Sequence, residues 1–107
     1  LIPTFRGILS SIYFHPNKNV TLNKIRKTLK KYYETSKFIK ILKTNTEIGS
    51  GNVLNTNKCE ISVCDTRIKN KFVIFSAIDN LIKGASGQAV QNMNTLYNFS
   101  EKMGFNE

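Results

Sequence analysis

The sequence predicts an α+β domain in which helices pack on one face of a mixed, largely antiparallel sheet. Segments of strand and helix character follow one another in the order strand, helix, strand, strand, strand, helix, at residues 7–14, 21–34, 38–42, 58–64, 71–78 and about 84–99. The strands have alternating or nearly continuous apolar residues, and the helices repeat apolar residues every three or four positions. With 107 residues, 40% of them hydrophobic, the chain is expected to form one domain, residues 1–107, with one core.

The first helix has the clearest pattern. Thr21 is placed to be its N-cap, and Leu22, Ile25 and Leu29 form an apolar stripe. Four lysines lie largely off this stripe, and we expect them to form a solvated face rather than a binding patch: Lys24, Lys27, Lys30 and Lys31. The strand before the helix and the strand after it are expected to complete a right-handed crossover unit.

The second half of the chain predicts a hairpin followed by a helix. Residues 58–64 alternate in polarity and residues 71–78 are almost continuously apolar, so they are expected to pair antiparallel. In the last helix one apolar stripe is expected to face the core: Val90, Met93, Leu96 and Tyr97. Apolar residues occupy both faces of several strands, so we expect a second copy or another domain to cover the face without helices.

The net charge of +9 is expected to reflect composition rather than a nucleic-acid ligand. Only Arg6, Arg26 and Arg67 are arginines, whereas recognition of bases and phosphates favours the forked guanidinium group. Abundant Lys, Asn and Ile are typical of an AT-rich genome. We therefore expect no nucleic-acid partner. No apolar run approaches the roughly 18 residues of a membrane span, so no membrane partner is expected either.

Cys59 and Cys64 are expected to be separate, reduced and structural thiols. They are five positions apart in a predicted strand, so they point to opposite faces and do not bridge each other. His15 is the only histidine, and two such thiols with one distant imidazole make a poor zinc site. No metal site is expected.

The junction between the last strand and the last helix contains Asp79, Asn80, Lys83, Gly84 and Gly87. Each glycine costs up to about 1 kcal/mol relative to alanine inside a helix, so two in one turn indicate that another group approaches the backbone. Free N–H groups at a helix start favour polar or anionic ligands. The alternative is that the small residues only allow the helix to pack tightly on the sheet.

Three stretches of the chain resemble one enzyme family. They are "LIPTFRGIL" at the start, "NTNKCEI" in the middle and "IDNLIKGASGQAVQNMN" at the junction. In this order they resemble the C-terminal part of N-acetyl-gamma-glutamyl-phosphate reductase, with Ser86 in place of an alanine. The junction is also similar, more distantly, to aspartate-semialdehyde dehydrogenase. The resemblance implies part of a glyceraldehyde-3-phosphate-dehydrogenase-like C-terminal domain, the substrate and dimerisation domain.

The resemblance implies an NADPH-dependent oxidoreductase of arginine biosynthesis, located in the cytoplasm. Its substrate is N-acetyl-gamma-glutamyl phosphate, which is reduced to a semialdehyde through a thioester on a cysteine, with a histidine as acid and base. Asn80 and Gly84 are then expected to bind the cofactor. Arg6 and Lys83 are candidates for substrate binding, although a structural arginine and a surface lysine stay open as alternatives. Homo-oligomers are expected to form through the open sheet face.

The chain departs from the family pattern where catalysis is concerned. The family's nucleophilic cysteine lies in an N-P-G-C-Y motif and its histidine in an H-x-H-x-x-E-I motif, and neither motif is present. We therefore expect no catalytic residue, a missing NADP-binding domain upstream of Leu1, and an inactive fragment of a longer enzyme. A non-catalytic assembly module of the same fold, and a basic nucleic-acid-binding domain, are the competing interpretations.

Overall fold

The computed structural model describes residues 3–107, and it contains the predicted elements in the predicted order. They are β1 (Ile8–Phe14), α1 (Leu22–Tyr32), β2 (Ile39–Ile41), the 3-10 helix η1 (Ser50–Asn52), β3 (Cys59–Asp65), β4 (Phe72–Ile78), the π-helix η2 (Ile82–Ser86) and α2 (Gly87–Leu96). The predicted α+β class with a mixed sheet is confirmed. No helix in the described range is long and apolar enough to cross a membrane.

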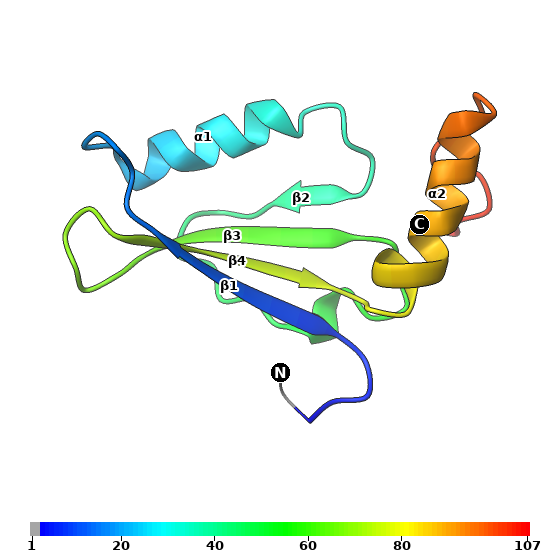
Figure 1. Cartoon of the computed structure of the whole chain (residues 1–107), viewed down its shortest axis with the longest axis horizontal. Helices are drawn as coiled ribbons and strands as arrows, with labels where there is room; N and C mark the ends of the chain where they lie inside the picture. Colours follow the sequence, from blue (N-terminus) through cyan, green and yellow to red (C-terminus); the bar gives the residue numbers. More distant parts are fainter. Residues whose placement is uncertain (1–2) are drawn as a thin grey trace.

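The four strands form one sheet in the order β1-β4-β3-β2 (Figure 1). β4 pairs antiparallel with β1 and with β3, which confirms the predicted hairpin, and β2 pairs parallel with β3. The connection through α1 therefore joins two parallel strands at opposite edges of the sheet. Ile12, Ile74 and Val63 lie side by side across three strands, so they share one face.

Helix α1 covers the part of the sheet formed by β2 and β3 (Figure 1). It begins as predicted, because Thr21 Oγ1 accepts a hydrogen bond from the Lys24 N–H at 3.2 Å. Arg26 fastens the helix to the chain after β2 by donating from Nε to the Leu42 carbonyl at 2.6 Å. The four lysines of α1 are exposed to solvent.

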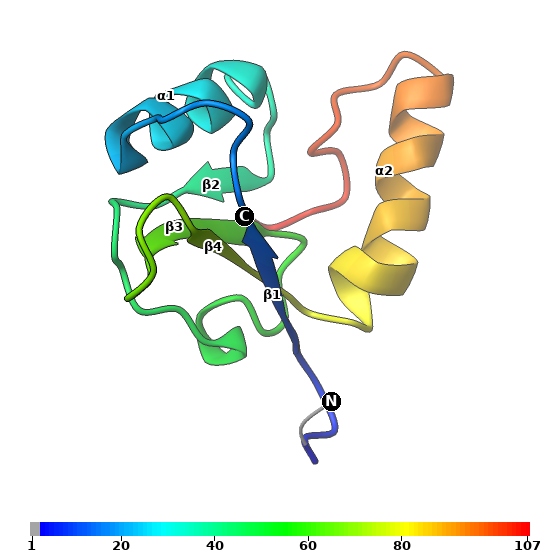
Figure 2. The same cartoon turned by 60° about the vertical axis from the view of Figure 1, so that its left-hand side comes forward.

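The opposite face of the sheet is covered in part by the chain itself. The segment between β2 and β3, residues 42–58, runs on the side of the sheet away from α1 (Figures 1 and 2). Ser62 donates to the Thr46 carbonyl at 2.7 Å, and Val53 and Ala77 are fully buried. The expectation that a second copy or another domain covers this whole face is therefore wrong for β3 and β4, because the chain's own loop covers them there. On this same face β1 is left uncovered, since Tyr13 is 60% exposed.

The prediction for the last helix is wrong in one respect. α2 stands beside the end of the sheet instead of lying over it, and Met93, Leu96 and Tyr97 are 47%, 76% and 62% exposed (Figure 2). The inward position is taken by Asn94, whose Nδ2 donates to the carbonyl of Met103 at 2.8 Å. The C-terminal segment thus returns along the inner side of α2 and displaces the apolar stripe from the core.

Candidate functional site

Asp79, the residue after β4, is the centre of the junction. Its side chain is fully buried and forms an ion pair with Arg6, with 2.8 Å between Arg6 Nη2 and Asp79 Oδ2. Arg6 Nε also donates to Oδ1 at 3.4 Å, and the Asn55 N–H donates to Oδ2 at 2.7 Å. One carboxylate therefore ties together the segment before β1, the loop before β3 and the end of β4.

These partners keep Asp79 ionised. Burial alone raises the pKa of the Asp79 carboxyl group, because it disfavours the charged form. Hydrogen bonds from the N–H groups of Asn55 and Leu81, together with the Arg6 guanidinium, outweigh burial and lower the pKa below its ordinary value. A buried carboxylate with this many donors is a structural anchor and holds no proton for catalysis.

The start of the last helix is capped from within the chain. Asp79 Oδ1 accepts from the N–H groups of Leu81 at 2.8 Å and Ile82 at 3.3 Å. The Gly84 N–H reaches the Asp79 carbonyl at 3.0 Å, five residues back, which makes the first turn a π-helix. The prediction that free N–H groups here await an anionic ligand is therefore wrong for these three donors.

Asn80 keeps one polar group available. Its Oδ1 accepts from the Gly7 N–H at 2.7 Å, and this fixes which end of the amide is oxygen, because only the oxygen accepts. The Asn80 Nδ2 group has no partner among residues 3–107. Gly7 has a φ of +100°, and an added Cβ would collide with Ser50, so the residue that orients Asn80 must be glycine. The junction thus presents one oriented amide donor.

The two glycines of the junction differ in what surrounds them. A Cβ added to Gly87 would collide with Asn57 Oδ1 and would lie 2.6 Å from Ile82 Cγ2 and 2.9 Å from the Ile82 carbonyl oxygen. At Gly84 the nearest atom, Ile78 Cδ1, is 3.5 Å from an added Cβ, which is an ordinary contact. Gly87 is therefore explained by packing, whereas nothing in residues 3–107 requires a glycine at position 84.

Arg6 and Lys83 are both engaged inside the chain. Besides Asp79, Arg6 contacts Asn55 Oδ1 through Nη1 at 2.7 Å. Lys83 turns beneath α2, where Nζ donates to Gln91 Oε1 at 2.7 Å and lies 5.5 Å from the centre of the Phe38 ring. Burial of Lys83 lowers the pKa of its ammonium group, although nearby anionic groups oppose this shift. Both side chains are placed as supports of the junction.

The structure adds two residues that sequence reasoning missed. Gly7 orients Asn80, and Asn55 holds both Arg6 and Asp79. Asn55 has a φ of +60°, which asparagine tolerates better than most residues. An asparagine in a polar loop is therefore the one feature of the sequence that could have pointed to this position. The contacts themselves span 24 or more positions, and no local pattern predicts them.

The cysteines lie as predicted on opposite faces of β3. Cys59 pairs across the sheet with Ile78 and Cys64 with Val73, five positions apart along the strand. Both thiols are free in the structure. Cys59 Sγ lies 3.4 Å from Ser76 Oγ, a contact that places it in the packed sheet rather than in an open pocket.

Comparison with known proteins decides the family. A family model described as semialdehyde dehydrogenase, dimerisation domain, matches residues 1–80. The chain belongs to this family. Solved structures agree on the fold: aspartate semialdehyde dehydrogenase II from Vibrio cholerae has a TM-score of 0.69 at 16% identity, over 91% of this chain and 29% of that one. Aspartate semialdehyde dehydrogenase from Francisella tularensis has a TM-score of 0.63 at 15% identity, over 90% and 28%.

Two relatives within the family carry the name that the three motifs predicted. N-acetyl-gamma-glutamyl-phosphate reductase from Clostridium botulinum (strain Eklund 17B / Type B) is 43% identical over 106 residues, which is 99% of this chain. The reductase of the same name from Vesicomyosocius okutanii subsp. Calyptogena okutanii is 42% identical over 107 residues. The predicted resemblance is confirmed. The chain spans 31% and 30% of the length of these two relatives.

Proposed function

We propose that the chain is the C-terminal part of an NADPH-dependent N-acetyl-gamma-glutamyl-phosphate reductase that works in the cytoplasm. The observation that carries this proposal is the 43% identity to the Clostridium botulinum reductase along 99% of the chain. The thiol and imidazole of the reaction would come from the remaining part of the enzyme, because their motifs are absent here. The chain by itself is then inactive.

The junction is proposed to meet the nicotinamide end of NADPH, which supplies the hydride when bound. Asn80 fits this role because its Oδ1 is held by Gly7 and its Nδ2 is left to donate to an amide oxygen of the ligand. Gly84 fits because it is exposed and its missing side chain is not explained by packing within residues 3–107. A Cβ at position 84 would lie 3.8 Å from Asn80 Cβ, so a larger side chain there would reduce the space beside Asn80.

Arg6 and Lys83 are proposed to act on the substrate site indirectly. The Nε, Nη1 and Nη2 atoms of Arg6 all contact Asp79 or Asn55. Arg6 thus holds Asp79, the residue directly before Asn80. Lys83 is directed toward Gln91 and Phe38 and away from solvent. The geometry thus favours the structural alternatives for both over direct binding of the acyl phosphate.

Assembly is proposed to use β1 and the sheet face around it. The family is named for dimerisation, and β1 is exposed on both faces: Leu9 and Tyr13 are 40% and 60% exposed on the face away from α1, and Ile12 is 51% exposed on the other. Apolar side chains this accessible on a sheet indicate a surface that another chain or domain covers. A homo-oligomer of the intact enzyme is the partner that the family description supports.

A hybrid enzyme tests the proposal. The C-terminal 31% of the Clostridium botulinum reductase is replaced by this chain, and NADPH oxidation is followed with N-acetyl-gamma-glutamyl phosphate as substrate. We expect turnover by the hybrid and none by the isolated chain. A folded hybrid that binds NADPH but never turns over would favour the competing interpretation, a non-catalytic module of the same fold.

A further inference from the structure

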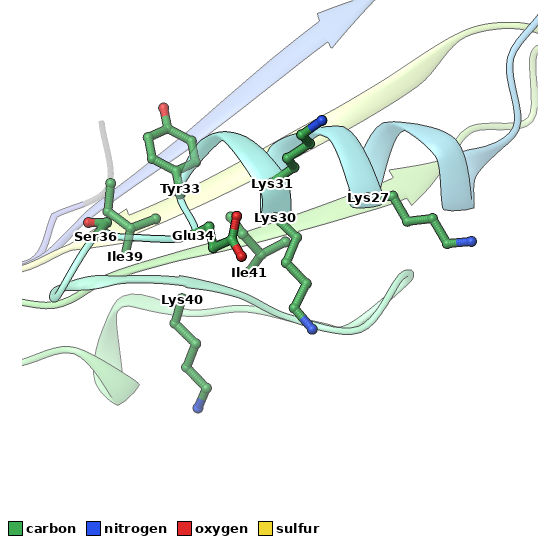
Figure 3. Close-up of a pocket in the computed structure, with 9 residues that line it drawn as sticks. All are labelled: Lys27, Lys30, Lys31, Tyr33, Glu34, Ser36, Ile39, Lys40 and Ile41. Atoms are coloured by element: carbon green, nitrogen blue, oxygen red, sulfur yellow. The ribbon is translucent and has the colours of Figure 1, made fainter.

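A groove with a volume of about 670 Å³ runs between α1 and β2, at the edge of the sheet farthest from β1 (Figure 3). Its floor is apolar and includes Tyr33, Ile39 and Ile41. Its remaining lining residues are mostly cationic: Lys27, Lys30, Lys31, Glu34, Ser36 and Lys40. The groove lies outside the junction, and none of its lining residues is among those proposed to meet the cofactor or the substrate.

The groove exposes a free strand edge. The Cys59 N–H donates to the Phe38 carbonyl and the Leu42 N–H donates to the Ile61 carbonyl, both at 2.9 Å. In a parallel pair the backbone N–H and C=O groups of successive residues point alternately toward and away from the neighbouring strand. Those of Phe38 and Leu42 point toward β3, so those of Ile39 and Ile41 point away from β3 and into the groove. An unpaired row of this kind is a template for another extended segment.

The charged side chains around this edge are predominantly cationic. Figure 3 shows Lys27 and Lys30 extending from α1 and Lys40 extending from β2 on the side away from the helix. Only Lys40 has an acidic partner within residues 3–107, Glu60 at 3.5 Å, and Lys40 stays 66% exposed. A strand placed beside β2 would therefore have cations on both of its faces.

We propose that this groove binds an extended acidic peptide segment, which adds to the sheet as a fifth strand beside β2. Ile39 and Ile41 supply the main-chain hydrogen bonds, and the lysines select carboxylate side chains. A second copy of the chain suits the groove poorly, because it would bring the same lysines against each other. A nucleic acid would satisfy the lysines but has no strand to pair with the two outward-facing residues.

The test uses the 107-residue chain and a peptide of about eight residues that alternates Glu with Val or Thr. We expect it to bind, and the same peptide with Gln in place of Glu to bind at least about five-fold more weakly. Lys27→Gln with Lys30→Gln is expected to weaken binding by a similar factor. Lys18→Gln with Lys69→Gln removes the same charge from exposed turns outside the groove, and it should change affinity by less than about two-fold.

Amide hydrogen exchange separates strand addition from charge attraction alone. The peptide should protect the amides of Ile39 and Ile41, while those of Lys40 and Leu42, which already face β3, should change little. Binding without that protection would overturn the proposal, as would equal binding of the Gln peptide or preferential binding of a single-stranded oligonucleotide. Absence of binding would overturn it as well.

Discussion

Gly84 and Gly87 are three positions apart in one helical stretch, and we predict opposite effects when each is changed to alanine. Both variants gain the same intrinsic helix propensity, up to about 1 kcal/mol. At Gly84 the new methyl group has no neighbour closer than 3.5 Å, so Gly84→Ala should raise the free energy of unfolding by about 0.5–1 kcal/mol. The expected gain does not depend on any ligand.

At Gly87 the same methyl group meets three obstacles. It would collide with Asn57 Oδ1 and approach Ile82 Cγ2 to 2.6 Å and the Ile82 carbonyl oxygen to 2.9 Å. Asn57 is fully buried and the carbonyl belongs to the backbone, so neither moves at small cost. Overpacking of this kind costs about 1–3 kcal/mol, and that is the expected difference in stability between Gly87→Ala and Gly84→Ala.

Urea unfolding of the two variants, followed by circular dichroism, measures this difference directly. A Gly87→Ala variant that unfolds at the same urea concentration as the unaltered chain, or at a higher one, would refute the assignment of Gly87 to packing. A Gly84→Ala variant that is as destabilised as Gly87→Ala would also remove the argument that position 84 is kept small for an external ligand.

Three further predictions concern the same region. Folding lowers the pKa of Asp79 below the ordinary value of 3.8, so the ionised carboxylate stabilises the fold fully above that pH. This stabilisation should be lost as the pH falls through the lower folded pKa, and the unfolding midpoint measured at successively lower pH values detects the loss. Asp79→Asn leaves Arg6 without its buried partner and should cost about 3–5 kcal/mol in denaturant unfolding, and a cost below about 1 kcal/mol would contradict its role as anchor. In the hybrid reductase, Gly84→Val should impair NADPH binding or hydride transfer more than melting temperature, and a large drop in melting temperature with normal NADPH binding would assign this glycine to packing.

The sequence predicted the elements that local patterns control. Thr21 caps α1 because its hydroxyl can reach the Lys24 N–H, three residues away, and this geometry is contained in a few adjacent residues. The hairpin of β3 and β4 likewise follows from two neighbouring strands. The last helix shows the limit: its apolar stripe was expected inward, but the returning C-terminal segment reaches Asn94 and leaves Leu96 exposed.

The candidate site could be located from sequence but not built from it. The motif indicated Asn80 and Gly84 at the junction, and the structure shows that Asn80 accepts from the Gly7 N–H and that an added Cβ at Gly84 would make only ordinary contacts. The partners that orient them come from distant segments, since Gly7 lies 73 positions before Asn80. The same limit applies to Arg6, whose partner Asp79 has no local signal in the sequence.

The most direct test of the proposed role of the junction is the rate of hydride transfer in the hybrid reductase carrying Asn80→Asp. This change keeps an oxygen to accept from the Gly7 N–H and replaces the Nδ2 donor by a second carboxylate oxygen, and Asn80→Leu, which removes both polar groups, serves as the variant without the added charge. The melting temperature of Asn80→Asp should change by a few degrees at most. The account predicts a rate lowered by about 10- to 100-fold, the loss expected when a buried polar group of the ligand is left without its donor. A hybrid that melts normally and transfers hydride at the unaltered rate would contradict it.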